Sequence, residues 1–301
     1  MSCPVCEAPV LDGDSFCEAC GHPLHAPRCA ACDAPAVDAE GYCERCGVRQ
    51  PTARDEAETV LDGGAAGITH KGLRRARNED AMALLARGAD TVAVVCDGVG
   101  SSPRADEASA LAARTAADAL AGGLGQAEAF ELAGRAVAEL ATSPDDAPAC
   151  TYVSAVVTGD RVSIAWAGDS RAYWLPGGST PGGAAPDGPP PGGTTADGTT
   201  PGGAAGCVPL TEDHVVPTGE ITAWLGADAA GVEPHLREFA ADGPGLLLVC
   251  TDGLWRYLDG YAFPPGRTPL DLSRELLRHA LDSGGHDNVT IVLIPLGGQH
   301  G

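Results

Sequence analysis

Three acidic sites adjoin apolar runs of the β-strand type, at Asp97, Asp252 and Asp287. Asp97 and Asp252 each follow such a run and precede a glycine, whereas Asp287 stands just before one. An aspartate at a strand end is held at the rim of a sheet, and a glycine beside it lets an ion or a backbone approach closely. Three carboxylates at aligned strand ends would supply the oxygen ligands that Mg²⁺ and Mn²⁺ prefer. Asp-Gly pairs also mark ordinary turns, which on this pattern alone are the commoner explanation.

Eight of the twelve cysteines lie in the first 46 residues, as two tetrads of identical spacing. In each tetrad two Cys-x2-Cys pairs are ten residues apart, and the tetrads repeat at a period of 26 residues. Two such turns brought together by a short hairpin supply four thiolates for a tetrahedral Zn²⁺. Four thiolates leave no open position on the ion, so the zinc is structural and its binding drives folding. We therefore predict two structural Zn²⁺ ions, one on Cys3, Cys6, Cys17 and Cys20 and one on Cys29, Cys32, Cys43 and Cys46.

The role of this cysteine module is open between docking to a protein partner and a purely structural appendage. Residues 1–50 carry eight acidic and three basic side chains, which disfavours nucleic acid. The whole chain has 19 basic and 41 acidic residues, a net charge of −22, so we expect no nucleic-acid or membrane partner. It contains no apolar run of membrane-spanning length and no signal pattern, and we expect a cytoplasmic protein.

The sequence divides into a cysteine module over residues 1–50, a flexible acidic linker over 51–65 and a large domain over 66–298. Apolar runs in the large domain predict strands, and alanine-rich amphipathic stretches predict helices. The segment 176–206 consists almost entirely of Gly, Pro, Ala, Thr and Ser, and we predict a disordered insertion there. The strands are expected at 91–96, 152–157, 161–167, 246–250 and 289–294, and the helices at 104–120, 126–140 and 272–281.

Six short motifs, in order along the large domain, raise the odds that the carboxylates bind metal. They are 72–80 (GLRRARNED), 95–100 (VCDGVG), 167–173 (AGDSRAY), 210–214 (LTEDH), 250–254 (CTDGL) and 285–290 (GHDNVT). Together they closely resemble the PPM-type phosphatase family, also called protein phosphatase 2C, over residues 66–298 outside the insertion. The cysteine module resembles the double zinc ribbon of bacterial regulatory proteins.

The phosphatase resemblance implies an α+β fold, a four-layer α-β-β-α sandwich of two antiparallel sheets with a metal cleft at one end. It implies two Mn²⁺ or Mg²⁺ ions, with Asp97 bridging both and the Gly98 carbonyl binding one. Asp252 and Asp287 would complete the protein ligands of the second ion.

The resemblance also assigns roles around the metals. Glu79 and Asp80 would hold waters on the ions, and Arg75 stands where the family places the arginine that binds the substrate phosphate. A planar guanidinium suits the paired oxygens of a phosphate. We interpret Asp169, Ser170 and Arg171 as a structural turn network rather than as catalytic groups.

Several positions depart from the family pattern. Val99 replaces the histidine proposed as an acid in animal members. Pro148 aligns with the aspartate that binds a third metal in bacterial members, although Asp145 and Asp146 are near. The segment after His214 is shorter than the mobile flap of the relatives, which leaves substrate selection open.

The expected function is hydrolysis of phosphoserine and phosphothreonine through a water activated by two metals, in opposition to a bacterial Ser/Thr kinase. One alternative is an adaptor whose zinc ribbons recruit a partner while the phosphatase domain is weak or silent. Another is a phosphatase that acts on an anti-sigma antagonist. Thr59, with Asp62 at position +3, resembles the phosphothreonine sites that forkhead-associated domains bind, although an unmodified acidic linker is the simpler explanation.

Overall fold

The computed structural model describes residues 2–3, 5–11, 16–21, 24, 28–38, 41–177, 206–229 and 231–297. The chain divides into two compact units, Met1–Ala53 and Arg54–Gly301. The first unit contains both cysteine tetrads. The predicted disorder of residues 176–206 falls almost entirely outside the described residues and stays a prediction.

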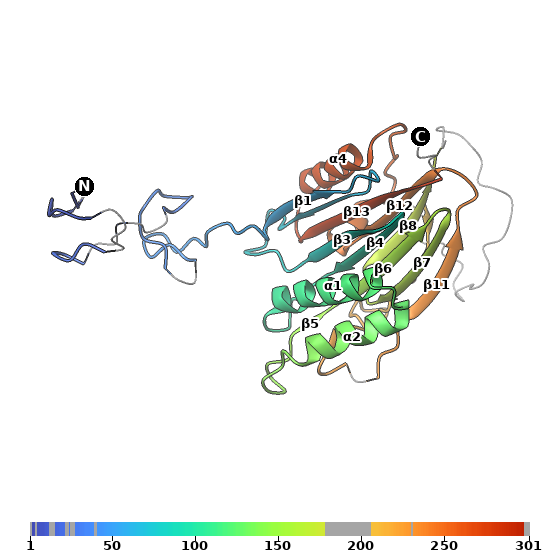
Figure 1. The fold of residues 1–301 in the computed structure, drawn as a ribbon, viewed down its shortest axis with the longest axis horizontal. Helices are drawn as coiled ribbons and strands as arrows, with labels where there is room; N and C mark the ends of the chain where they lie inside the picture. The colour runs from blue at the N-terminus through green and yellow to red at the C-terminus, as the bar shows by residue number, and fades with distance from the viewer. Residues whose placement is uncertain are drawn as a thin grey trace. The chain divides into compact units, whose positions relative to one another are not determined.

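Two antiparallel sheets form the centre of the second unit (Figure 1). The six-stranded sheet has the order β1 (Glu56–Val60), β2 (Ala66–His70), β13 (Val289–Leu296), β12 (Gly245–Cys250), β8 (Arg171–Pro176) and β9 (Val208–Pro209). The five-stranded sheet has the order β11 (His235–Ala240), β7 (Arg161–Ala167), β6 (Tyr152–Thr158), β4 (Asp90–Cys96) and β3 (Ala81–Arg87). A short pair joins β10 (Leu225–Gly226) to β5 (Ala149–Cys150).

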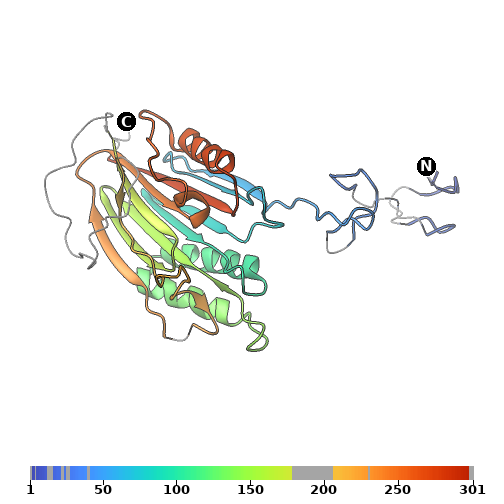
Figure 2. The ribbon, with the colours of Figure 1, turned by 180° about the vertical axis from the view of Figure 1, so that it is seen from behind.

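Helices cover the outer faces of both sheets (Figure 1; Figure 2). The helices α1 (Ala105–Ala121) and α2 (Gln126–Ala138) pack on the five-stranded sheet. The helices α3 (Asp252–Trp255) and α4 (Pro269–Asp282) pack on the six-stranded sheet. The predicted four-layer α-β-β-α sandwich is therefore confirmed. None of the helices that the structure describes is long and apolar enough to span a membrane.

Side chains that alternate between the two faces of each strand form three apolar layers, which lie between the four layers of helices and sheets. In β4, Val92 and Val94 face the helices, whereas Ala93 and Val95 face the other sheet. Successive side chains of a strand point to opposite faces, so a strand buried on both sides is apolar throughout. The alanines of α1 allow this helix to approach its sheet closely, which suits a chain that is only 4% aromatic.

The strand registers bring distant segments to one rim of the sandwich. Cys96 pairs with Ala81 at the end of β4, and Cys250 pairs with Arg171 at the end of β12. At the same rim, Val289 opens β13 opposite His70. The acidic motifs directly adjoin these strand ends. The fold therefore brings together acidic residues that are far apart in the sequence.

The linker predicted over residues 51–65 is shorter in the structure. The boundary between the two units falls after Ala53, and residues 56–60 form β1, an edge strand paired with β2. Glu58 on β1 also forms a two-point ion pair with Arg274 of α4, at 2.7 and 3.0 Å. Alternate apolar residues are missing from β1, so its sequence resembles a solvated linker although its backbone completes the sheet.

Candidate metal-binding active site

Asp97 lies directly after β4, where both of its backbone polar groups are fixed. Its N–H donates to the Thr151 hydroxyl at 3.0 Å, and its carbonyl accepts from the Thr151 N–H at 2.7 Å. The Thr151 hydroxyl also contacts the Ser170 hydroxyl at 2.8 Å. Three segments therefore hold the first acidic motif at a defined position on the rim.

Asp80, which precedes β3, and Asp252, which follows β12, are both buried, at 6% and 7% exposure. The Thr251 hydroxyl donates to Asp80 Oδ2 at 2.8 Å, and Arg256 contacts Asp252 Oδ2 at 2.7 Å. The second oxygen of each carboxylate, Oδ1, is buried and accepts no hydrogen bond in the described part of the chain. Buried carboxylate oxygens are normally satisfied, so these two are suited to bind a cation.

Asp287 lies two residues before β13 and contacts the predicted phosphate-binding arginine. Arg75 Nη2 lies 2.7 Å from Asp287 Oδ2, and its pKa is raised mainly by this hydrogen bond. Gly72 has a left-handed φ of +74°, and a Cβ at this position would lie 2.1 Å from the Asp287 carbonyl oxygen. Only glycine fits this close approach, which presses the Arg75 loop against the Asp287 segment.

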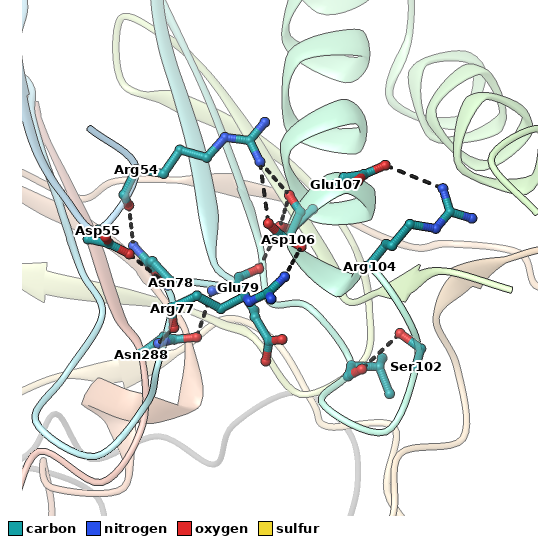
Figure 3. A network of polar contacts seen from close by, with 12 residues as sticks. Arg54, Asp55, Arg77, Asn78, Glu79, Ser102, Arg104, Asp106, Glu107 and Asn288 are labelled. Carbon is teal, nitrogen blue, oxygen red and sulfur yellow. Dashed lines mark hydrogen bonds and ion pairs between the residues drawn. The ribbon is translucent and has the colours of Figure 1, made fainter. Parts of the chain in front are cut away.

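Asn288 ties the Glu79 segment to this rim (Figure 3). Its side-chain oxygen accepts from the Glu79 N–H at 2.8 Å, and its amide donates to the carbonyls of Lys71 and Arg77 at 2.8 and 2.9 Å. The Glu79 carbonyl accepts from the Ser109 hydroxyl of α1 and from the Gly98 N–H. The Glu79 backbone is thus fixed, and its carboxylate Oε2 lies 4.0 Å from the position that a Cβ on Gly100 would take.

A second network in Figure 3 joins this segment to the first residues of the large unit. Asp106 in the first turn of α1 forms ion pairs with both Arg54 and Arg77. The Asn78 amide donates to the Arg54 carbonyl at 2.9 Å, and the Asn78 N–H donates to Asp55. Residues 54 and 55 are therefore part of the active-site scaffold.

Burial and mutual repulsion raise the pKa values of the acidic groups at the rim. Burial, followed by the charges of the neighbouring carboxylates, raises the pKa of Asp97 well above its usual range. Burial raises the pKa of Asp80 to about 7 and that of Asp169 to about 6. Burial is also the main cause of the raised pKa of Glu79 and of Asp252. Such a set of carboxylates resists ionisation until a cation neutralises it.

These observations fit divalent cations. The donors are hard oxygens, two of them are buried without a partner, and the charge of the cluster is only partly balanced by Arg75 and Arg256. The carboxylates are more widely spaced than the cysteines: among the described residues, only the cysteine tetrads place three or more ligand atoms within 4.8 Å of one another. The ligand roles of Asp97, Gly98, Asp252 and Asp287 stay predictions on this geometry.

The turn after β7 contains the three residues that we interpreted as a structural network. Arg171 forms a two-point ion pair with Asp213 and stacks on Trp255 at 3.5 Å, as a structural network should. The Asp169 carboxyl, however, lies in the field of Asp252, which contributes to its raised pKa.

The candidate third-metal residue Asp146 is engaged elsewhere. It accepts hydrogen bonds from Arg104 at 2.8 and 3.3 Å and contacts the Thr142 hydroxyl, and these bonds lower its pKa. Arg104 adopts a left-handed φ of 49° and also donates to the Leu140 carbonyl. The structure thus gives Asp146 a cationic partner from the protein itself.

The two cysteine tetrads have the dimensions of zinc sites. The Sγ atoms of the pairs 3–20, 6–17, 29–46 and 32–43 are 3.5 to 3.7 Å apart. A tetrahedron with Zn–S bonds of about 2.3 Å has edges of about 3.8 Å. Gly21 and Gly47, which follow the last cysteine of each tetrad, have φ values of +72° and +71° and close tight turns onto Cys17 and Cys43. Each tetrad is therefore fitted to one structural zinc ion.

Comparison with known proteins gives a match for the cysteine module and another for the large domain. Residues 3–47 match the family model described as double zinc ribbon, and residues 69–187 match that described as protein phosphatase 2C. No curated protein matches the chain. The second match includes Arg75, Glu79, Asp80 and Asp97 but ends before the other two aspartates.

Solved bacterial serine/threonine phosphatases share the fold. Stp1 from Staphylococcus aureus is 22% identical, over 80% of this chain and 96% of its own, with a TM-score of 0.61. PstP/Ppp from Mycobacterium tuberculosis is 23% identical, over 78% and 98%, with a TM-score of 0.55. The PstP catalytic domain in complex with two manganese ions is 22% identical, over 77% and 97%, with a TM-score of 0.56. Residues 69–187 therefore match the protein phosphatase 2C family, within a domain that has the fold of bacterial serine/threonine phosphatases, and residues 3–47 match the double zinc ribbon.

Proposed function

We propose that the domain hydrolyses phosphoserine and phosphothreonine in proteins with the help of two divalent cations. The observation that carries this proposal is the rim cluster of Asp97, Asp252, Asp287 and Asp80, with two orphaned buried oxygens. Its similarity to the manganese-bound PstP domain supports the same assignment. Bound cations would supply a nucleophile at neutral pH and neutralise the phosphoryl oxygens.

The protein's own residues have separate tasks in this proposal. Asp97, the Gly98 carbonyl, Asp252 and Asp287 would hold the cations. Glu79 and Asp80 orient water at the cluster. Arg75 would bind the phosphate oxygens, and its present contact with Asp287 holds the guanidinium at the edge of the cluster. This arrangement needs no cysteine nucleophile, which agrees with the complete burial of Cys96 and Cys250.

The direct test is hydrolysis of a phosphothreonine peptide with Mn²⁺ by the full chain and by Asp97→Ala and Asp252→Ala. We expect the wild type to be active and each variant to lose at least about a hundredfold in kcat, because metal-supplied charge stabilisation is lost. Arg161→Glu, at the opposite rim, is the control and should retain activity. Equal inactivity of the wild type and the two aspartate variants would favour the adaptor alternative.

The biological setting is a further part of the proposal. We infer that the enzyme works in the cytoplasm against the products of a bacterial Ser/Thr kinase, with an anti-sigma antagonist as the alternative substrate. Recognition of phosphorylated Thr59 by a forkhead-associated domain faces a structural obstacle. Thr59 is half-buried in β1 and paired with Gly67 of β2, so that β1 would have to leave the sheet. Mass spectrometry that always finds Thr59 unmodified in the native protein would rule this partner out.

A further inference from the structure

The loop between β2 and β3 is positively charged although the chain carries a net charge of −22. Residues 71–77 contain Lys71, Arg74, Arg75 and Arg77 and no acidic residue. Arg75 and Arg77 are paired with Asp287 and Asp106. Lys71 and Arg74 have no side-chain hydrogen bond or ion pair within the residues that the structure describes. The positively charged side chains of Lys71 and Arg74 are therefore available to bind an anionic ligand.

This loop is held in place before any ligand binds. The Asn288 amide donates to the carbonyls at both of its ends, those of Lys71 and Arg77. The Leu73 N–H donates to the Gly285 carbonyl at 2.8 Å, and Gly72 is packed against the Asp287 backbone. A loop fixed in this way loses little conformational entropy on binding, so that weak surface contacts can contribute to affinity.

The loop also lies against the proposed phosphate site. Arg75 Nη1 is 3.5 Å from the position that a Cβ on Gly100 would take, and Gly100 belongs to the loop that follows Asp97. Arg74 directly precedes Arg75 in the chain. Leu73, whose side chain packs near Gly285, is 63% exposed. An extended peptide advances about 3.3–3.6 Å per residue, so residues within about three positions of the phosphorylated one reach this loop.

We propose that Arg74 and Lys71 bind anionic side chains that flank the phosphorylated residue, so that the enzyme selects acidic phosphopeptides. This inference rests on the proposed phosphatase function and names its substrate class. The anion is a carboxylate or a second phosphate, since both accept hydrogen bonds from a guanidinium fork. Away from this loop the acidic surface would repel such a peptide, so the selectivity is local to residues 71–75.

The test compares three phosphothreonine peptides that differ only in their flanks, which carry Asp and Glu, Gln and Ala, or a second phosphothreonine. The full chain with Mn²⁺ should show a kcat/KM about five- to tenfold higher for an anionic flank than for the neutral one, mainly through KM. This ratio should fall towards one at 0.5 M salt, because exposed charge pairs are screened. The anionic flank with the larger ratio identifies the anion that the loop prefers.

The variant Lys71→Glu/Arg74→Glu should bring the ratio to one or below, with the neutral peptide as internal reference. Arg161→Glu makes the same kind of charge change in the β6–β7 turn, at the opposite rim, and should leave the ratio unchanged. Equal rates on all three peptides, or a preference that survives the double variant, would overturn the inference. Failure of the wild type to hydrolyse even p-nitrophenyl phosphate would instead overturn the phosphatase function itself, and the inference with it.

Discussion

The side-chain amide of Asn288 joins several segments of the rim. It is 3% exposed, and its three hydrogen bonds join the Glu79 segment, the basic loop and the start of β13. Each bond satisfies one backbone N–H or carbonyl group. The proposed metal site and the proposed peptide-binding loop therefore depend on the same amide.

We predict that Asn288→Ala destabilises the protein by about 2–4 kcal/mol, because it leaves several buried polar groups without partners. It should also raise the Mn²⁺ concentration needed for half-maximal activity, since Glu79 and Asp287 lose their common support. Denaturant unfolding and a Mn²⁺ titration of peptide hydrolysis measure the two effects. Asn288→Asp keeps the acceptor for the Glu79 N–H, so its stability should lie between those of the wild type and Asn288→Ala. An unfolding free energy within about 0.5 kcal/mol of the wild type would contradict this prediction.

At the residue scale the sequence predicted the acidic groups better than their partners. Asp97, Asp252 and Asp287 could be singled out because each adjoins an apolar run and stands in an ordered motif. The amide bonds of Asn288 and the contact of Arg256 with Asp252 could not, because they are set by tertiary packing and side-chain orientation. The raised pKa of Asp169 could not be predicted for a related reason, since it follows from burial and from neighbours that only the fold supplies.

Elements were predictable where burial imposes a periodic pattern. The strands β4, β6, β7, β12 and β13 and the helices α1, α2 and α4 lie where apolar runs and amphipathic stretches indicated them. The edge strand β1 was not predicted, because four of its five residues are exposed and its stability comes from backbone pairing and the Glu58 ion pair. The short strands β5, β9 and β10 have only two residues each, too few for any pattern.

The side chain and backbone of His214 anchor the turn that follows the fourth motif. His214 Nδ1 accepts from the Gly168 N–H at 3.1 Å, and the His214 backbone bonds to Gly168 and Thr222. Its ring lies edge-on to His235 of β11, with centroids 4.2 Å apart, and near Trp166 of β7. Burial, followed by the charge of His235, lowers the pKa of His214, while Asp213 and Glu212 oppose this shift. The folded protein therefore favours the neutral form of the His214 ring.

We predict that His214→Leu destabilises the protein by about 1–2 kcal/mol at pH 8, because the Gly168 N–H loses its acceptor. A folded-state pKa below the unfolded value of 6.5 means that the His214 contribution is present above pH 6.5 and is lost as the pH falls through the lower folded value. The stability difference between wild type and variant should therefore shrink from pH 8 to pH 5. Urea unfolding of both proteins in EDTA measures it. A difference that grows at low pH would show that the imidazolium is the stabilising form.

At the scale of the whole molecule the chain consists of two units with different sources of stability. The phosphatase unit buries three apolar layers, whereas the described buried apolar groups of the ribbon unit are few and include four cysteines. Such a small unit depends on its metal, because the binding free energy of zinc is its folding free energy. The proposed roles of the ribbons in partner capture and of the domain in hydrolysis can therefore be separated experimentally.

We predict that the full chain, purified with excess Mn²⁺ to keep zinc out of the rim cluster, contains two zinc ions per chain. Cys6→Ser and Cys32→Ser should each lower the count to one, because each removes a thiolate from a different tetrad. Cys96→Ala, a buried cysteine outside the ribbons, is the control and should keep two. Elemental analysis gives the count, and thermal unfolding should show that the main transition, which reports the phosphatase unit, is unchanged in Cys6→Ser. A single transition that shifts by many degrees when zinc is lost would mean that the ribbons and the catalytic unit fold as one.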